Sequence, residues 1–336
     1  MKNFKKIFSV ALLMFIIISF SCPNTFAASD TVVLGGQPFG IKFYNRGVIV
    51  IEMQSFFNGQ KYICPAKNSG LKVNDIITQI NGETVNTNEA LQSKVLCSNG
   101  QDLTFTIERN GKEIKKTVSP KKNMAGSYII GAWIRDSCAG IGTITYYDTN
   151  KNYFTALGHG VCDSKTSALL PLGFGQVVGA KISGVTKSVS GKAGSLNGYF
   201  TDNSIGILTS NTSNGVYGTT NDIFIPKGKT VEIADKNEIK VGKAQIYTTI
   251  NGTNPKYYDI EITKICNTQQ NSNENFVIKV TSDEIIDECG GIVQGMSGSP
   301  IIQNEKLVGA VTHVFLNNPC EGYGVIAQNM ALNYNK

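Results

Sequence analysis

Residues 290–300 read Gly-Gly-Ile-Val-Gln-Gly-Met-Ser-Gly-Ser-Pro. Seven of these eleven residues are Gly, Ser or Pro, a composition typical of a tight turn. Apolar pairs flank the stretch, Ile-Ile at 285–286 and again at 301–302. We expect a turn between two buried segments, with Ser297 at its tip.

Within this turn, residues 295–300 read Gly-x-Ser-Gly-x-Pro, the pattern with which trypsin-like proteases present a nucleophilic serine. Gly295 lets the backbone fold back, so that its N–H and that of Ser297 converge as an oxyanion hole. Ser299 is the alternative nucleophile, but a residue before proline is conformationally restricted. We expect Ser297 to be the nucleophile.

A general base for Ser297 must come from one of only two histidines. His159 follows an apolar segment, lies between two glycines and precedes Ser297, in the trypsin-like order of base before nucleophile. His313 lies in a strand-like run soon after Ser297 and is expected to be structural. The prediction is that His159 is the base.

A third member that orients the imidazole is usually a carboxylate. Asp202 follows His159 at a trypsin-like spacing, and Asp283 precedes Ser297 after a serine that looks like a helix start. Asp163 and Asp287 lie close in sequence to the base and to the serine turn. Spacing alone leaves these four alternatives open.

The bulk properties limit the function classes. Residues 1–28 combine three lysines with an apolar run and a small-residue end, which predicts a signal peptide or an N-terminal anchor. Without this segment the charge balance is mild, and nothing indicates nucleic acid. Seven irregularly spaced cysteines then remain, which favours small buried residues over a zinc site, with one disulfide left open. No metal or organic cofactor is expected.

Residues 33–120 are predicted to form a small β-rich domain. The run at 66–82 closely resembles the hallmark of a PDZ domain, which binds a peptide end between a strand and a helix. We expect the carboxylate loop at Gln-Pro-Phe-Gly, residues 37–40, next to an edge strand at 41–43. The expected peptide-binding residues are Pro38, Phe39, Gly40 and Ile41.

A polar, Gly-containing linker at 121–126 leads into residues 127–336. These are Gly-rich, and short β-like runs recur with turns between them, while only 327–334 looks helical. The fold class we expect is mainly β, a PDZ domain followed by a trypsin-like double β-barrel.

The segments around His159 and Ser297, the Ile-Arg-Asp-Ser run at 134–137 and the Gly-Ala-Val-Thr-His-Val-Phe run at 309–315 together resemble the SpoIVB peptidases. These are the stage IV sporulation serine peptidases of endospore-forming bacteria. The resemblance implies His159 as base and Ser297 as nucleophile. It also implies an Asp about 15 residues before the serine, where this chain has Ser282 and then Asp283. Asp283 is the preferred third member, and Asp202 the alternative.

The resemblance further implies export across the forespore membrane and cleavage of a membrane-bound regulator, which leads to sigma-factor processing. It implies self-processing of the N-terminal region, which could also be a PDZ ligand. Two rival functions are an inactive exported PDZ adaptor and an envelope-stress protease. In stress proteases of the high-temperature-requirement type, the PDZ domain follows the protease domain, whereas here it comes first.

Overall fold

The computed structural model describes residues 31–224, 226–266 and 272–334. The predicted signal peptide or anchor at 1–28 lies outside these residues. From Thr31 onward the chain forms one compact unit. Across the described ranges, no helix is both long and apolar enough to cross a membrane.

Six strands form the first barrel of the peptidase. Antiparallel pairing runs from β2 to β11, β12, β15, β14 and β13 and returns to β2, so the ring is closed. Buried side chains fill it, among them Phe39, Phe43 and Phe154. The strands are β2 (Pro38–Met53), β11 (Ala132–Asp148), β12 (Tyr153–Ala156), β13 (Leu172–Thr186), β14 (Ser195–Thr212) and β15 (Gly215–Thr220), with β1 (Thr31–Leu34) and β16 (Thr230–Glu232) at the side of β11.

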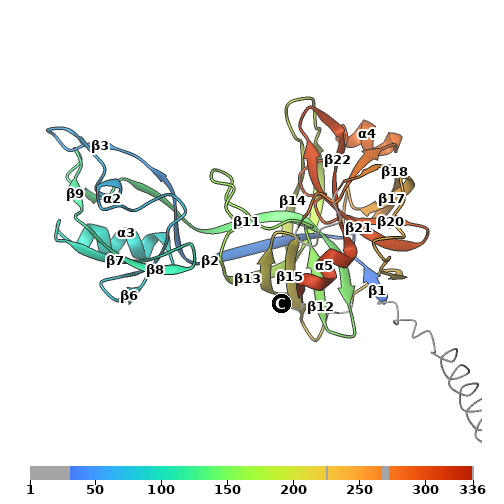
Figure 1. The fold of residues 1–336 in the computed structure, drawn as a ribbon, viewed down its shortest axis with the longest axis horizontal. Helices are drawn as coiled ribbons and strands as arrows, with labels where there is room; N and C mark the ends of the chain where they lie inside the picture. Colours follow the sequence, from blue (N-terminus) through green and yellow to red (C-terminus); the bar gives the residue numbers. More distant parts are fainter. Residues whose placement is uncertain (1–30, 225, 267–271, 335–336) are drawn as a thin grey trace, which may run out of the picture. The chain divides into compact units, whose positions relative to one another are not determined.

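The second barrel is also closed and carries the serine turn (orange to red in Figure 1). Its strands alternate buried and exposed residues, as in Lys256–Ile265, so one face of each packs inward. Its members are β17 (Gly242–Thr248), β18 (Lys256–Ile265), β19 (Phe276–Val280), β22 (Asn318–Ile326), β21 (Lys306–Phe315) and β20 (Pro300–Gln303), with helices α4 (Asp283–Cys289) and α5 (Ala327–Tyr334). The predicted double barrel is confirmed, and so is the closing helix at 327–334.

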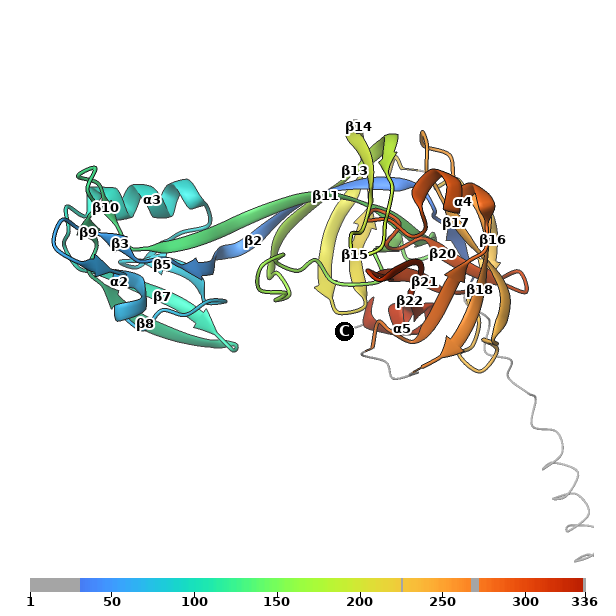
Figure 2. The same cartoon turned by 90° about the horizontal axis from the view of Figure 1, so that it is seen from above.

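The PDZ domain has its own core, which includes Leu91, Phe105 and Ile107. Helix α3 (Asn88–Cys97) begins at an N-cap, where the Thr87 side chain accepts a hydrogen bond from the Ala90 N–H at 3.1 Å. The remaining elements are β3 (Phe56–Phe57), β4 (Tyr62–Ile63), α2 (Pro65–Asn68), β5 (Ile76–Ile80), β6 (Glu83–Thr84), β7 (Leu103–Arg109), β8 (Lys112–Val118), β9 (Lys121–Lys122) and β10 (Tyr128–Ile129) (Figure 2).

The domain boundaries differ from the predicted 33–120 and 127–336. The first part of β2 pairs with β13 of the peptidase, whereas its later part pairs with β5 of the PDZ domain. The PDZ domain is therefore inserted between the barrel strands β2 and β11. The predicted linker at 121–126 is part of a hairpin, in which β9 pairs with β10.

Candidate active site

The serine turn has the backbone that its glycines predict. Gly295 has φ +101° and Gly298 has φ +92°, conformations that other residues rarely adopt. A Cβ on Gly298 would lie 2.1 Å from the carbonyl oxygen of Thr143. The turn thus requires glycine at 298 both for its conformation and for its close approach to β11.

Strand β11 of the first barrel binds this turn with three hydrogen bonds. The Thr143 N–H donates to the Ser297 carbonyl at 3.0 Å, and the Thr143 hydroxyl donates to the Gly295 carbonyl at 2.8 Å. The Thr145 hydroxyl donates to the Gly298 carbonyl at 2.8 Å. Because both threonines are buried, these bonds are shielded from water and fix the turn against the first barrel.

The carbonyls of Gly295 and Ser297 are thus bonded, but their N–H groups are not. Neither N–H has a hydrogen-bond acceptor among the residues that the structure describes. Both residues are half-buried. Free donors two residues apart on a glycine turn are what an oxyanion hole requires.

His159 follows two residues with positive φ, Leu157 at +69° and Gly158 at +68°. A Cβ on Gly158 would lie 3.0 Å from the Thr312 side chain, so this bend packs directly on β21. It brings the His159 ring beside His313, with ring centroids 5.0 Å apart. His159 and His313 are therefore neighbours in the fold, although 154 positions separate them in the sequence.

The protonation state of His159 follows from its surroundings. Its Nδ1 lies 2.9 Å from the Gly160 carbonyl oxygen, which can only accept a hydrogen bond. The proton is therefore on Nδ1, which leaves Nε2 free to accept one. Burial and, to a smaller extent, the nearby His313 lower the pKa of His159 from 6.5 to about 4, although the Gly160 bond acts in the opposite direction. His159 is thus a neutral imidazole at physiological pH.

The Ser297 hydroxyl is not hydrogen-bonded to His159. It donates to the Thr312 carbonyl at 2.9 Å. Since Thr312 directly precedes His313, the serine and both histidines meet at one end of β21. A turn of the Ser297 side chain away from Thr312 would be needed before its proton could pass to His159. The alternative nucleophile Ser299 is buried and donates to the Thr248 hydroxyl at 2.8 Å.

The structure does not bring the predicted carboxylates to His159. Asp283 is the first residue of α4 and Asp202 lies in β14, and both side chains are exposed. Asp287 is exposed in α4, and the buried Asp163 pairs with Arg135. No described carboxylate is hydrogen-bonded to or ion-paired with His159; the Gly160 carbonyl occupies its Nδ1 side instead. Asp283 does not contact His159, because the residue at the expected spacing, Ser282, is a helix N-cap rather than a strand residue.

The prediction that residues 38–41 bind a peptide is wrong. Pro38, Phe39, Gly40 and Ile41 lie in β2, where they pair with β11 on one side, and from Phe39 onward with β13 on the other. All four are buried, so this segment has no free edge to which a peptide could add. The physical reason is that this part of β2 completes the first barrel.

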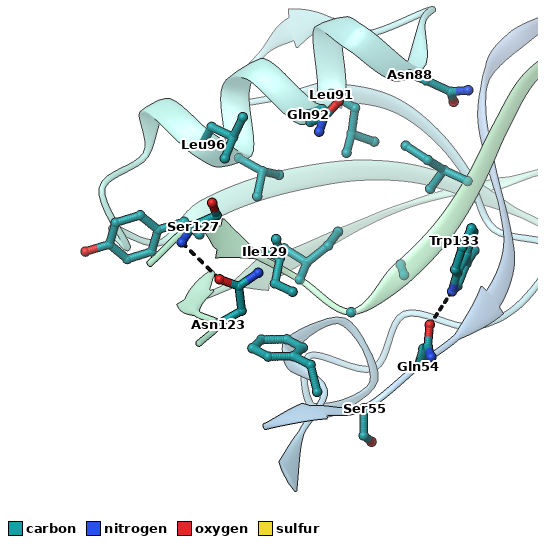
Figure 3. A pocket seen from close by; sticks show the side chains of 17 residues that line it. Gln54, Ser55, Asn88, Leu91, Gln92, Leu96, Asn123, Ser127, Ile129 and Trp133 are labelled. Carbon is teal, nitrogen blue, oxygen red and sulfur yellow. Dashed lines mark hydrogen bonds between the residues drawn. The ribbon is translucent and has the colours of Figure 1, made fainter. Parts of the chain in front are cut away.

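A groove of about 800 Å³ lies elsewhere in the PDZ domain, between α3 and the segment 127–134 (Figure 3). The α3 side includes Leu91, Gln92 and Leu96, and the opposite side includes Ile129 and Trp133. The signal for this groove was the run Tyr-Ile-Ile-Gly-Ala-Trp-Ile at 128–134, an apolar segment interrupted by one glycine. Gly131 has φ +74°, and a Cβ there would lie 2.6 Å from the Gln54 carbonyl oxygen.

Two β-barrels that meet at a serine, a neutral histidine and two free N–H groups define a serine peptidase, here with a PDZ domain. The chain belongs to the SpoIVB peptidase S55 family, whose model matches residues 126–331. The PDZ family model matches residues 39–119. These matches confirm two predictions, that the chain is a SpoIVB peptidase and that it contains a PDZ domain.

Among curated relatives, the probable protease eep of Enterococcus faecalis is 39% identical over 67 residues, or 20% of this chain and 16% of its own. The zinc metalloprotease RasP of Geobacillus kaustophilus is 36% identical over 102 residues, or 28% of this chain and 24% of its own. The matches span about a quarter or less of these relatives. Among solved structures, the HtrA-type protease AlgW with a decapeptide gives a TM-score of 0.34 at 10% identity, covering 68% of this chain and 54% of its own.

Proposed function

We propose that Ser297 cleaves peptide bonds by acyl transfer, with His159 as its general base. His159 Nε2 takes the hydroxyl proton while Ser297 Oγ attacks a peptide carbonyl carbon. The N–H groups of Gly295 and Ser297 then donate to the oxyanion, and the imidazolium protonates the leaving amine. Water, deprotonated by His159, attacks the acyl-enzyme and releases the acid. The observation that carries this proposal is the serine turn, in which neither the Gly295 N–H nor the Ser297 N–H has an acceptor among the described residues, while the Ser297 hydroxyl binds Thr312 next to His313, the neighbour of His159.

We propose that the α3 groove recruits the peptide substrate or a peptide regulator. A strand added along segment 129–134 would place alternate side chains against the apolar residues of α3. Gln92 is exposed on the groove side of α3, whereas its neighbour Ser93 is exposed and does not line the groove. This pair offers a matched comparison.

The groove is tested with Gln92→Trp, which fills it, and Ser93→Trp, which adds the same ring outside it. A pool of decapeptides with free apolar carboxyl ends is titrated against each, with the amidated pool as probe control. We expect binding to wild type and Ser93→Trp, and at least about a tenfold weaker affinity for Gln92→Trp. Equal affinities for all three proteins would contradict a binding role for the groove.

At the cellular level, we propose that the chain is exported across the forespore membrane and cleaves a membrane-bound regulator of sigma-factor processing. Membership of the SpoIVB family and the basic, apolar segment at 1–28 support this. The test is a chromosomal Ser297→Ala allele in an endospore-forming host. Loss of heat-resistant spores and of regulator cleavage is expected, while protein abundance stays at the wild-type level. Full sporulation with Ser297→Ala would favour the non-catalytic adaptor, and broad degradation of unfolded casein the envelope-stress protease.

A further inference from the structure

The loop that carries His159, residues 157–171 and here called the base loop, is fixed by two polar side chains. The first is Asn211 of β14. Its side-chain oxygen accepts from the Val161 N–H at 2.8 Å, and its side-chain nitrogen donates to the carbonyls of Val161 and Leu170, both at 2.9 Å. These bonds anchor the base loop to the first barrel.

The second is Asp163, four residues after His159, which is only 2% exposed. One of its oxygens accepts from the N–H groups of Lys165 at 2.9 Å and Thr166 at 3.0 Å. Burial alone would raise the pKa of Asp163, but these two bonds and the charge of Arg135 outweigh it and lower the pKa. Asp163 is therefore a buried carboxylate that stays ionised, and such a group requires a positive partner.

That partner is Arg135, whose Nε lies 2.8 Å from the second Asp163 oxygen. The geometry is that of an ion pair and not of a hydrogen bond, so the contact is set by charge. Arg135 is half-buried on β11, with a register irregularity next to it, between Arg135 and Ser137. Irregularities of this kind re-aim side chains and are common beside active sites.

The two neighbours of Arg135 contact the α3 groove or the helix that forms its wall. Ile134 lines the groove, and Asp136 accepts from the backbone N–H of Asn88 at 2.8 Å and from its side-chain nitrogen at 3.2 Å. Asn88 is the first residue of α3, a wall of the groove. Three consecutive residues of β11 thus contact the groove, the base loop and the groove helix.

We propose that Arg135 is a positioning residue for His159, acting through Asp163, and that it links the base loop to the strand that lines the peptide groove. The proposal rests on the acyl-transfer function above. Asp163 fixes the loop conformation, and Arg135 keeps that carboxylate charged and in place. Without Arg135 the unpaired carboxylate moves toward water, and the bend at His159 moves with it.

The test compares Arg135→Ala, Arg135→Lys and Asp163→Asn in the full chain. A fluorophosphonate probe reports the labelling rate of Ser297, and a fluorogenic peptide reports kcat and KM. We expect kcat and the labelling rate to fall about 10- to 100-fold in Arg135→Ala, because small misplacements of catalytic groups have effects of this size. KM changes less than about threefold, and Arg135→Lys restores part of kcat. The acid limb of kcat/KM moves up toward the ordinary range of histidine as the loop opens to water.

Arg109→Ala is the matched control, since Arg109 also pairs with a buried aspartate, Asp75, at 2.6 Å, but inside the PDZ domain. It lowers the melting temperature while the labelling rate and the pH profile stay unchanged. Wild-type labelling rate and pH profile in a folded Arg135→Ala chain would overturn the positioning role. A wild-type chain that does not label at Ser297 would instead refute the proposed function.

Discussion

His159 is held by a backbone carbonyl, that of Gly160, where a trypsin-like site has a carboxylate. A carbonyl fixes the tautomer as well as an aspartate does, but it carries no full charge to stabilise the imidazolium. The lowered pKa of His159 agrees with this, because burial is opposed only by that bond. The proposed site is therefore a Ser–His pair whose imidazole is oriented by the main chain.

The pH dependence of activity follows from this arrangement. The folded pKa of His159 is about 4, so the neutral base is present well above this pH and is lost as the pH falls through about 4. We expect the acid limb of kcat/KM to have its midpoint near pH 4. The profile is measured between pH 3 and 8 with a fluorogenic peptide that does not titrate in this range. A midpoint at 6.5 would show that His159 is solvated and unperturbed.

Loss of either predicted carboxylate should have little effect. Asp283→Ala and Asp202→Ala are expected to keep kcat/KM within about threefold of wild type, because neither side chain contacts His159. In a triad that depends on its aspartate, the loss is on the order of 10⁴-fold. Steady-state kinetics of both variants decides between the two. A loss of a hundredfold or more in one variant would restore that residue as third member.

At the scale of elements, β11 organises the site. Its Thr143 and Thr145 bind the serine turn, and its Arg135 contacts the base loop. The turn itself comes after α4, whose C-cap Gly290 has φ +71° and so ends the helix. The proposed nucleophile Ser297 and the proposed base His159 thus depend on the same strand, although neither residue lies on it.

Gly298→Ala tests how closely the turn approaches β11. The new Cβ would lie 2.1 Å from the Thr143 carbonyl oxygen, at a φ of +92°. We expect a loss of about 2–4 kcal/mol in the free energy of unfolding and at least about a hundredfold loss of kcat. Denaturant unfolding and kinetics measure the two effects.

Gly184→Ala in β13 is the control, because its Cβ would meet nothing within 4 Å. It should change the free energy of unfolding by less than about 1 kcal/mol. If Gly298→Ala behaves like Gly184→Ala, the serine turn does not have the close-packed form described above.

At the scale of the whole molecule, the insertion of the PDZ domain between β2 and β11 is the main departure from the sequence-based expectation. The turn at Ser297 and the His159 segment could be predicted because their patterns are local in sequence. The role of Phe39 and Ile41 could not, since their partners in β11 and β13 lie about 100 and 140 residues away. An alternating apolar run predicts a strand but not the sheet that it joins. For Asp283 the local pattern was the better guide than the spacing, because the serine before it indicated the helix start that the structure has at Ser282.

The insertion predicts that the fragment 127–336 does not fold. It lacks β2, so the first barrel would open between β11 and β13 and lose Phe39 and Phe43 from its core. We expect this fragment to be insoluble or without a cooperative thermal transition, whereas 31–336 has one. Circular dichroism during heating measures this. A soluble, active 127–336 fragment would contradict the nested arrangement.

The insertion also restricts self-processing. Cleavage within 31–45 of the folded chain would cut β1, the barrel part of β2 or the connection between them, all of which are largely buried. We expect any self-processed form to retain Thr31 and the whole of β2. Amino-terminal sequencing of the processed protein checks this, and a product that begins inside β2 would contradict it.

Mass spectrometry of the fluorophosphonate adduct shows whether Ser297 is the nucleophile and His159 its base. We expect one adduct on Ser297 in wild type, none in Ser297→Ala, and labelling at least about a thousandfold slower in a folded His159→Ala chain. An adduct on Ser299, or a labelling rate that does not depend on His159, would contradict this assignment.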